Sequence, residues 1–245
     1  MARIYLVRHG QAGFNKLDYD QLSDLGHQQS QYVGHSLNTR GIEAGLVVHG
    51  AMKRHRETMQ GAQTVWHSYG PVIELPGFNE FDSDDVIAGA HIELNIPGFY
   101  KEGIASHNLV QKTALGAHLA LQKNPKKAFQ ELFSIAINRW ISGEHDEDYM
   151  ESWQHFTLRC KQALLEAVEK AGGKDIVIFT SGGPITAIVQ HSLGLSDQYA
   201  FEFNWSLVNA GITQLLYNQQ GKISLASSNE QEHLISVGKK FLTYR

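Results

Sequence analysis

Arg8, His9 and Gly10 follow one another directly behind an apolar run at residues 4–7. The Arg8 guanidinium offers a planar fork of donors that suits phosphate oxygens. The His9 ring can act as a nucleophile or as a base near neutral pH. Gly10 allows a sharp backbone turn beside a ligand. These residue types indicate phosphate chemistry, although three letters alone also fit an Arg-His pair that only solvates a strand end.

A second guanidinium stands in the segment "KRHRET", which reads as the start of a helix. Arg54 and Thr58 are four residues apart and therefore share a helical face. If Arg54 and Arg8 lie at the same edge of a sheet, their positive charges repel unless an anion lies between them. The alternative is a basic first turn exposed to water, which we expect for Lys53 and Arg56.

A carboxyl group follows the third apolar run, in the segment "FNEFDSDD". Glu80 could serve as a general acid for a leaving oxygen beside two arginines. The segment also reads as an acidic loop, and we expect Asp82, Asp84 and Asp85 to be solvated. Spacing alone does not separate Glu80 from these neighbours.

The stretch "DIVIFTSGGPI" joins a β-branched run to a helix through two glycines. Pro184 suits a first helical turn, where its missing N–H costs nothing. Ser181 or its neighbour could cap the helix, and free backbone N–H groups near Gly182 favour an anion. A glycine turn that serves only the strand-to-helix geometry is the alternative.

The elements that must position these residues alternate along the chain. Apolar runs predict strands at 4–7, 45–50, 71–75 and 175–180, followed by a late hairpin of about 211–217 and 222–227. Helical periodicity predicts a helix that opens at "LSDLG" (22–26) and ends at Gly41, helices at 51–66 and about 152–171, and a helix from Pro184 onward. This order predicts an α/β three-layer sandwich, with a mainly parallel sheet and helices on both faces. Ligands of such sheets lie beyond the carboxyl ends of the strands, where all four segments fall.

Between about residues 77 and 155 the strand signals vanish. Helical patterns at 107–122 and 128–141 indicate a helical insertion. A chain of 245 residues suits one large α/β domain, so we expect a single domain at 1–245 with a cap insertion at about 81–155.

Composition limits the possible partners and ligands. The net charge of -4 gives no overall attraction for nucleic acid or anionic membranes, and a single cysteine excludes an internal disulfide or a multi-thiolate metal site. No run approaches transmembrane length, and the first apolar stretch is too short for a signal peptide. We expect a cytoplasmic protein that needs no metal or cofactor; its oligomeric state stays open.

Taken together, the segments resemble the histidine phosphatase superfamily, which contains the cofactor-dependent phosphoglycerate mutases. The resemblance is an ordered set that covers most of the chain. It comprises "RHG" at 8–10, Asn15, "LSDLGHQQS", "KRHRET" with Arg54 and Thr58, "FNE" with Glu80, and "SNEQEHL" near residue 230.

The resemblance implies a mechanism and a phosphoglycerate mutase-like fold. His9 attacks phosphorus and becomes a phosphohistidine, while Arg8, Arg54 and Asn15 hold the phosphoryl oxygens. Glu80 protonates the leaving alkoxide and then activates water. The implied function is a metal-independent phosphomonoesterase that acts on a phosphorylated small molecule or a phosphoprotein, with Ser181 and Gly182 completing the phosphate site.

One position departs from the family pattern. The family's second catalytic histidine precedes the paired glycines, where this chain has Ser181. A neutral hydroxyl is a weaker donor than a charged ring, and losing one transition-state donor typically costs about 10²–10³ in rate. We therefore expect slow turnover, and we hypothesise that His49, behind the neighbouring strand, substitutes for the missing histidine.

Three other functions stay open. A non-catalytic phosphate-binding or regulatory protein would keep the pocket without turnover. A phosphoglycerate mutase fits less well, because Phe14 and Asn15 follow "RHG" where the mutases have a Trp-Asn pair and a longer signature. A serine hydrolase with Ser181 as nucleophile ranks last, because "TSGGP" lacks the G-x-S-x-G elbow.

Overall fold

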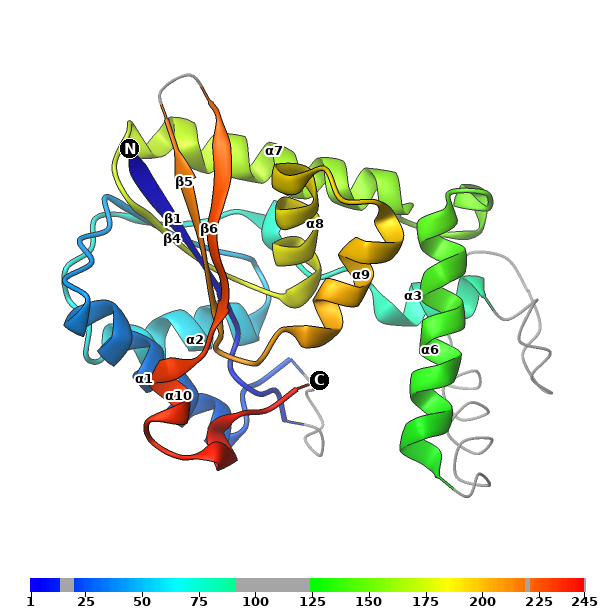
Figure 1. The fold of residues 1–245 in the computed structure, drawn as a ribbon, viewed down its shortest axis with the longest axis horizontal. Coiled ribbons are helices and arrows are strands. Elements are labelled where there is room, and N and C mark those ends of the chain that lie inside the picture. Colours follow the sequence, from blue (N-terminus) through cyan, green and yellow to red (C-terminus); the bar gives the residue numbers. More distant parts are fainter. Residues whose placement is uncertain (14–19, 91–123, 219–220, 245) are drawn as a thin grey trace. The chain divides into compact units, whose positions relative to one another are not determined.

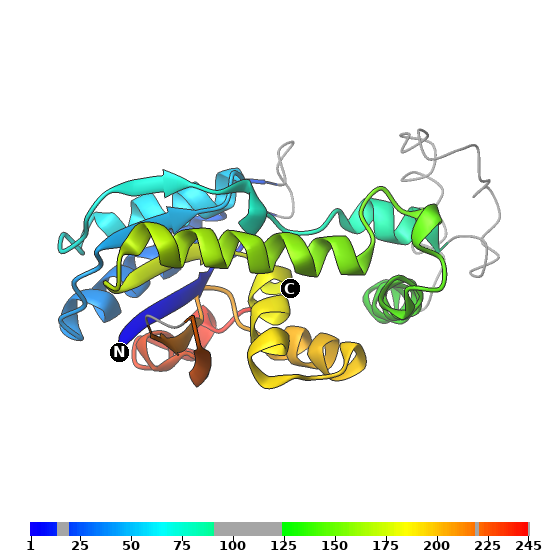
Figure 2. The ribbon, with the colours of Figure 1, turned by 90° about the horizontal axis from the view of Figure 1, so that it is seen from above.

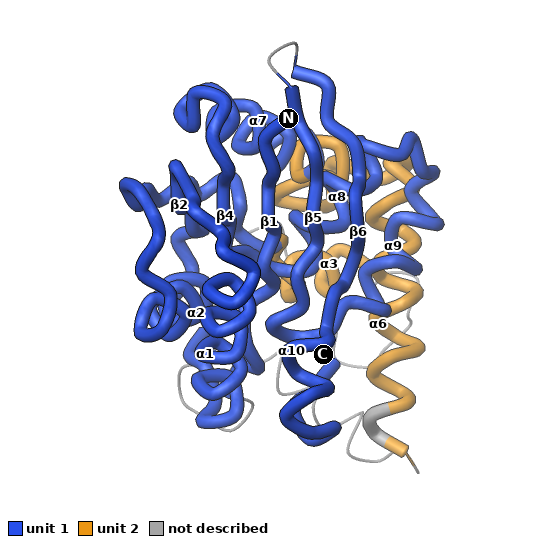
Figure 3. The backbone as a smooth tube through the Cα atoms, turned by 60° about the vertical axis from the view of Figure 1, so that its left-hand side comes forward, with its two compact units in different colours: residues 1–80, 157–245 blue, residues 81–156 orange. Residues whose placement is uncertain are grey.

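The computed structural model describes residues 1–13, 20–90, 124–218 and 221–244. The chain divides into two compact units, which Figure 3 colours separately. Unit 1 comprises residues 1–80 and 157–245, and unit 2 comprises residues 81–156. Unit 2 is thus an insertion in the sequence of unit 1.

Unit 1 is built on a six-stranded sheet (Figure 1). Its strands are β1 (Ala2–Arg8), β2 (Leu46–His49), β3 (Val72–Glu74), β4 (Ile176–Thr180), β5 (Ile212–Tyr217) and β6 (Ile223–Glu230). Its helices are α1 (Asp24–Thr39), α2 (Lys53–Gln63), most of α7 (Trp153–Ala171), α8 (Gly182–Leu193), α9 (Asp197–Ser206) and α10 (Glu232–Ile235), with short 3₁₀ turns at Pro76–Phe78 and Lys239–Phe241.

The strand order is β3-β2-β4-β1-β5-β6, and Figure 3 labels β2, β4, β1, β5 and β6 in this order across the sheet. β1, β2, β3 and β4 run parallel, and β5 and β6 form the antiparallel hairpin. The predicted α/β fold with a mainly parallel sheet is therefore confirmed. Because the central strands are parallel, Arg8 at the end of β1 pairs with Thr180 at the end of β4.

Helices cover both faces of the sheet (Figures 1 and 2). Alternate residues of β1 point to opposite faces, as the two-residue period of a strand requires. Ile4 and Leu6 pack into a core with α7 and α8, whereas Tyr5 and Val7 pack into a second core with α1 and α2. Buried on both sides, β1 and β4 read in the sequence as continuous apolar runs.

Local signals explain most helix boundaries. Ser23 caps α1, because its Oγ accepts the N–H of Gly26 at 3.0 Å. α2 begins at Lys53 without a side-chain cap from its N-cap residue, Met52. Instead, the Lys53 N–H donates to Asp20 Oδ2 at 2.7 Å, a long-range contact that the local pattern does not reveal.

Some predicted elements differ from the structure. The predicted helix at 51–66 is shorter, and α9 was not expected. The predicted helix at 107–122 lies outside the described residues. No helix in the described parts of the chain is both long enough and apolar enough to cross a membrane.

Unit 2 contains α3 (Ser83–Gly89), α6 (Pro125–Ser142), a 3₁₀ turn at Asp146–Asp148 and the beginning of α7. Four aromatic rings pack together in it: Phe81, Trp140, Trp153 and Phe156, with centroid distances from 4.8 to 5.7 Å. A buried ion pair joins Arg139 to Asp148 at 2.6 Å. Unit 2 therefore has a core of its own; its role as a cap stays a prediction.

Candidate active site

The carboxyl ends of the parallel strands bring the predicted site residues to one edge of the sheet. His9 follows β1, and Ser181 follows β4, which lies next to β1. The His9 N–H donates to Thr180 O at 2.8 Å, which ties the loop after β1 to the last residue of β4. All the site residues discussed below belong to unit 1.

The His9 ring is buried, and its two nitrogens have different surroundings. Its Nδ1 lies 2.7 Å from Gly10 O, so Nδ1 carries the proton in the tautomer that makes this hydrogen bond. Nε2 is then the lone-pair nitrogen, and it has no hydrogen-bond partner among the described residues. Burial lowers the pKa of His9 well below its ordinary value, and the charges of Arg54, Arg8 and His55 lower it further. The ring is thus neutral near pH 7, as a nucleophile must be.

The turn after His9 depends on two close backbone contacts. A Cβ added at Gly10 would lie 2.5 Å from Gly26 O, and a Cβ at Gly26 would lie 2.2 Å from Gln11 O. The Gly10 N–H donates to Thr58 Oγ1 at 3.1 Å, and the same hydroxyl donates to Arg54 O at 2.7 Å. Thr58 therefore connects the turn after β1 to α2. This contact explains why the segments "RHG" and "KRHRET" contribute to the same site.

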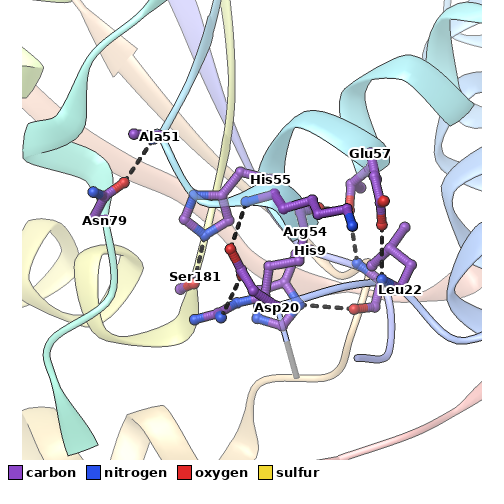
Figure 4. A network of polar contacts seen from close by, with 12 residues as sticks. His9, Asp20, Leu22, Ala51, Arg54, His55, Glu57, Asn79 and Ser181 are labelled. Carbon is purple, nitrogen blue, oxygen red and sulfur yellow. Dashed lines mark hydrogen bonds and ion pairs between the residues drawn. The ribbon is translucent and has the colours of Figure 1, made fainter. Parts of the chain in front are cut away.

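Two buried guanidinium groups flank His9. Arg8 is 5% exposed and donates through Nη1 to Leu207 O. Arg54 is 4% exposed, and its Nη1 lies 2.8 Å from Asp20 Oδ1. Figure 4 shows Asp20, Arg54 and His9 close together. Because both cations lower the pKa of His9, the site carries the positive potential that an anion needs.

Glu80 lies at the N-terminus of α8. The Gly183 N–H donates to its Oε1 at 3.1 Å and its Oε2 at 3.3 Å. The anion at this helix end is therefore the protein's own carboxylate, where the sequence suggested free N–H groups for a ligand. Glu80 is buried, whereas Asp82 and Asp84 are exposed as expected. The expectation that Asp85 is solvated was wrong, because its side chain is buried and its Oδ2 accepts the Met150 N–H at 2.9 Å.

Ser181 occupies the N-cap position of α8, but its side chain does not cap the helix. Its Oγ lies 2.6 Å from Nε2 of His55, and both residues are completely buried. Figure 4 shows this contact between α2 and the loop before α8. Burial lowers the pKa of His55 well below its ordinary value, and the charges of Arg54 and His49 lower it further.

The neighbouring Gly182 lies against two polar side chains. A Cβ added there would meet Asn204 Oδ1 at 2.5 Å and Arg8 Nε at 3.6 Å. The glycine therefore makes room for the Asn204 side chain, whereas the distance to Arg8 is an ordinary contact distance. Its role in binding phosphate, like that of Ser181, stays a prediction.

The other predicted residues are placed differently. The His49 Nδ1 lies 2.9 Å from Gly50 O and 3.9 Å from the Glu74 carboxylate, and the histidine on Ser181 is His55 instead. Asn15 lies outside the described residues. In the described parts of the chain, no group of three or more His, Cys, Asp or Glu side chains is placed to hold a metal ion.

Sequence reasoning missed His55 and Asp20. His55 is adjacent to Arg54, and the signal was its position three residues before Thr58 on the buried side of α2. Asp20 carries no local signal, because only the fold brings it to the start of α2.

Comparison with known proteins agrees with this arrangement. The sequence profile described as "Histidine phosphatase superfamily (branch 1)" matches residues 4–108 and 114–230. A search of curated proteins found no match.

Solved structures share the fold at low identity. The chain is similar to a phosphoglycerate mutase from Bacillus anthracis, with 15% identity, 96% and 95% of the two chains covered and a TM-score of 0.62. It is similar to a phosphoserine phosphatase of Entamoeba histolytica in complex with 3-phosphoglyceric acid, with 20% identity, 96% and 100% coverage and a TM-score of 0.60. It is also similar to a putative alpha-ribazole-5'-P phosphatase of Escherichia coli, with 17% identity, 94% and 98% coverage and a TM-score of 0.62.

Proposed function

Because the chain belongs to branch 1 of the histidine phosphatase superfamily, we propose that it is a metal-independent phosphomonoesterase that forms a phosphohistidine on His9. One observation carries the proposal. The buried, neutral His9 ring has a lone-pair nitrogen, Nε2, without a partner among the described residues, and two buried arginines flank it.

The first step transfers the phosphoryl group to the protein. His9 Nε2 attacks phosphorus in line, the ester P–O bond breaks, and the leaving alkoxide takes a proton from the Glu80 carboxyl group. Arg8 and Arg54 stabilise the charge on the phosphoryl oxygens. For Arg54 this requires that a phosphate oxygen replaces Asp20 Oδ1, which lies on its guanidinium at 2.8 Å.

The second step releases phosphate. The Glu80 carboxylate takes a proton from water as the water oxygen attacks phosphorus, and the P–N bond breaks to regenerate neutral His9. The hydrogen bonds from Gly183 N–H hold the carboxylate in one orientation for both proton transfers. A phosphorylated small molecule or a phosphoprotein is the substrate class, and unit 2 would form the cap that selects it.

The position of Ser181 favours a second candidate, a phosphate-binding protein without turnover. Ser181 stands where the family pattern places its second catalytic histidine, and a neutral hydroxyl stabilises a transition state less than an imidazolium does. Retention of both His9 and Glu80 argues for the enzyme, because a binding protein needs neither a nucleophile nor an acid.

A phosphoenzyme trap separates the two functions. Phosphoserine, 3-phosphoglycerate, sugar phosphates and phosphopeptides would be tested with the wild type, His9→Ala and the control His191→Gln, whose exposed ring lies in the last turn of α8. We expect an acid-labile phosphoprotein and phosphate release in the wild type and the control, and a loss of at least about 10³-fold in His9→Ala. Phosphate binding without any phosphoenzyme would support the binding protein, and undiminished turnover by His9→Ala would contradict the proposal.

A further inference from the structure

The contact between His55 and Ser181 takes no part in the two proposed phosphoryl-transfer steps. Both side chains are completely excluded from solvent, and the distance from Nε2 to Oγ is 2.6 Å. The His55 ring also lies 5.8 Å from the His9 ring, measured between centroids. The ionisable His55 ring thus contacts Ser181, the residue that precedes α8, and it also lies beside His9.

We propose that His55 and Ser181 together do the work of a single cationic histidine: His55 takes up a proton when a tetrahedral dianion binds, and Ser181 passes this charge to the anion as a hydrogen-bond donor. The proposal rests on the proposed function, because it assigns the anion to the His9 pocket. Ser181 would touch the anion, and His55 is a positioning residue that acts through it.

The direction of the hydrogen bond decides what Ser181 can do. A neutral His55 whose Nε2 carries the lone pair accepts the Ser181 hydroxyl proton, and the hydroxyl then has no proton for an anion. A protonated His55 has a hydrogen on both ring nitrogens, so Nε2–H must donate to Ser181 Oγ. The serine O–H is then free to donate elsewhere, and it does so with the strength of a charge-assisted network.

The site favours the neutral ring before the anion binds. Burial lowers the pKa of His55, Arg54 on the same helix lowers it next, and His49 at the end of β2 lowers it further, whereas the Gly50 backbone opposes the shift. Among the described residues, other charged or titratable groups near the pair are His9 after β1 with Arg8 before it, the Asp20 carboxylate on Arg54, and the Glu80 carboxylate that accepts the Gly183 N–H of α8.

A bound dianion reverses this balance. Two negative charges in the pocket offset Arg54 and Arg8, and an opposite charge within about 4–6 Å favours the charged form of a histidine. One proton then moves from solvent to His55 for each anion bound, and no covalent bond changes. Phosphate binding and the protonation of His55 are therefore coupled, and each strengthens the other.

Sulfate is the probe for this coupling, because inorganic phosphate titrates in the same pH range and would add its own protons. Histidine ring nitrogens would be observed by NMR near pH 7, with and without saturating sulfate, in the wild type, His55→Gln, Ser181→Ala and His191→Gln. Glutamine keeps a hydrogen-bonding group of similar size at position 55 but takes no proton, which separates charge from packing. Ser181→Ala is the smaller change if His55→Gln does not fold.

We expect the His55 signals to change from neutral to cationic on sulfate binding in the wild type and in His191→Gln. In Ser181→Ala, sulfate affinity should fall by about tenfold. In His55→Gln, kcat should fall on the order of 10²-fold. The alkaline limb of the wild-type pH profile, where His55 loses its proton, should be missing in His55→Gln.

Other outcomes would overturn the proposal in distinguishable ways. Sulfate binding with a neutral His55 would remove the coupling but leave the phosphatase function untouched. No sulfate binding at all would contradict both. A phosphoryl or fluorophosphonate adduct on Ser181 would make the serine a nucleophile with His55 as its base. Protonation of His55 without any phosphohistidine would leave this inference standing and remove the proposed function.

Discussion

The rings of His9 and His55 lie 5.8 Å apart at an angle of 37°, and each is buried beside Arg54. His9 belongs to the loop after β1, and His55 belongs to the first turn of α2. Burial and the neighbouring charges lower the pKa of both rings, so the folded protein holds two adjacent neutral imidazoles.

This pair predicts how stability depends on pH. An unfolded histidine titrates near pH ~6.5, and both rings have a lower pKa in the folded state. The unfolded state therefore binds more protons as the pH falls below about 6.5, and the free energy of unfolding should decrease there. Each ring contributes a slope of about 1 kcal/mol per pH unit between its folded and unfolded pKa values.

Thermal or urea unfolding, measured from about pH 5 to about pH 8, would test this dependence because the range brackets the unfolded histidine pKa of about 6.5. His55→Gln should flatten the slope, whereas the control His35→Gln, which removes an exposed ring on α1, should not. An equal slope in the wild type and His55→Gln would show that His55 does not titrate differently in the two states.

The second prediction concerns Glu80. In Glu80→Gln, the amide oxygen can still accept the Gly183 N–H, so the melting temperature should stay close to that of the wild type. The variant has no proton to give to a leaving alkoxide, so kcat should fall by about 10²–10⁴. The control is Glu74→Gln, a half-exposed carboxylate at the end of β3. Substrates with good leaving groups should lose less, and a uniform loss would argue against an acid role.

The third prediction concerns Asp20 on the Arg54 guanidinium. Asp20→Asn removes a negative charge that competes with phosphate, so phosphate should bind more tightly. Asp20 is about a third exposed, which limits the gain to about 1 kcal/mol or roughly fivefold. Calorimetric titration of phosphate would measure it. The control Asp24→Asn makes the same change of charge at an exposed position in the first turn of α1. Weaker binding in Asp20→Asn alone would show that Asp20 orients Arg54 for the ligand.

The fourth prediction moves the histidine of the pair from position 55 to position 181. Ser181→His alone places a ring where His55 already lies 2.6 Å away, so it should destabilise the protein by about 1–3 kcal/mol. In the double variant with His55→Ala, the space of the removed ring becomes available to the new one. We expect the double variant to be more stable and more active than Ser181→His. Equal defects in both variants would show that the position cannot accept a histidine.

Much of the site could be predicted from the sequence because it depends on local order. The carboxyl ends of parallel strands lie at one edge of a sheet, which places Arg8 and Ser181 there whatever the details of packing. Glu80 could be named only through the resemblance to a family, because its contact with Gly183 crosses between two distant segments. The hypothesis that His49 substitutes for the histidine implied by the family resemblance followed the same edge rule and stays a prediction. The histidine that contacts Ser181 is His55, which a helical phase, and not a strand end, brings to it.

The helices and strands, too, could be predicted from the sequence only where the signal is local. The apolar runs of β1 and β4 were visible because both faces of these strands are buried. α9 was not, since only two of its residues, Ala200 and Phe201, are buried and it lacks a clear apolar stripe. The start of α2 is held by Asp20 from another segment, so its boundary could not be read from nearby residues.

The pairing partners of β1 determine when this strand can take its place in the sheet during synthesis. β1 pairs with β4 and β5, so Ile4 lies opposite Ile176 and Leu215. The Asn209 side chain binds the carbonyl oxygen of His9, across 200 residues of sequence. A ribosome that has just made β1 must therefore add most of the chain before the strand finds either partner. The strand that precedes His9 is made well before both of its partner strands, and until they follow its apolar run is exposed to aggregation.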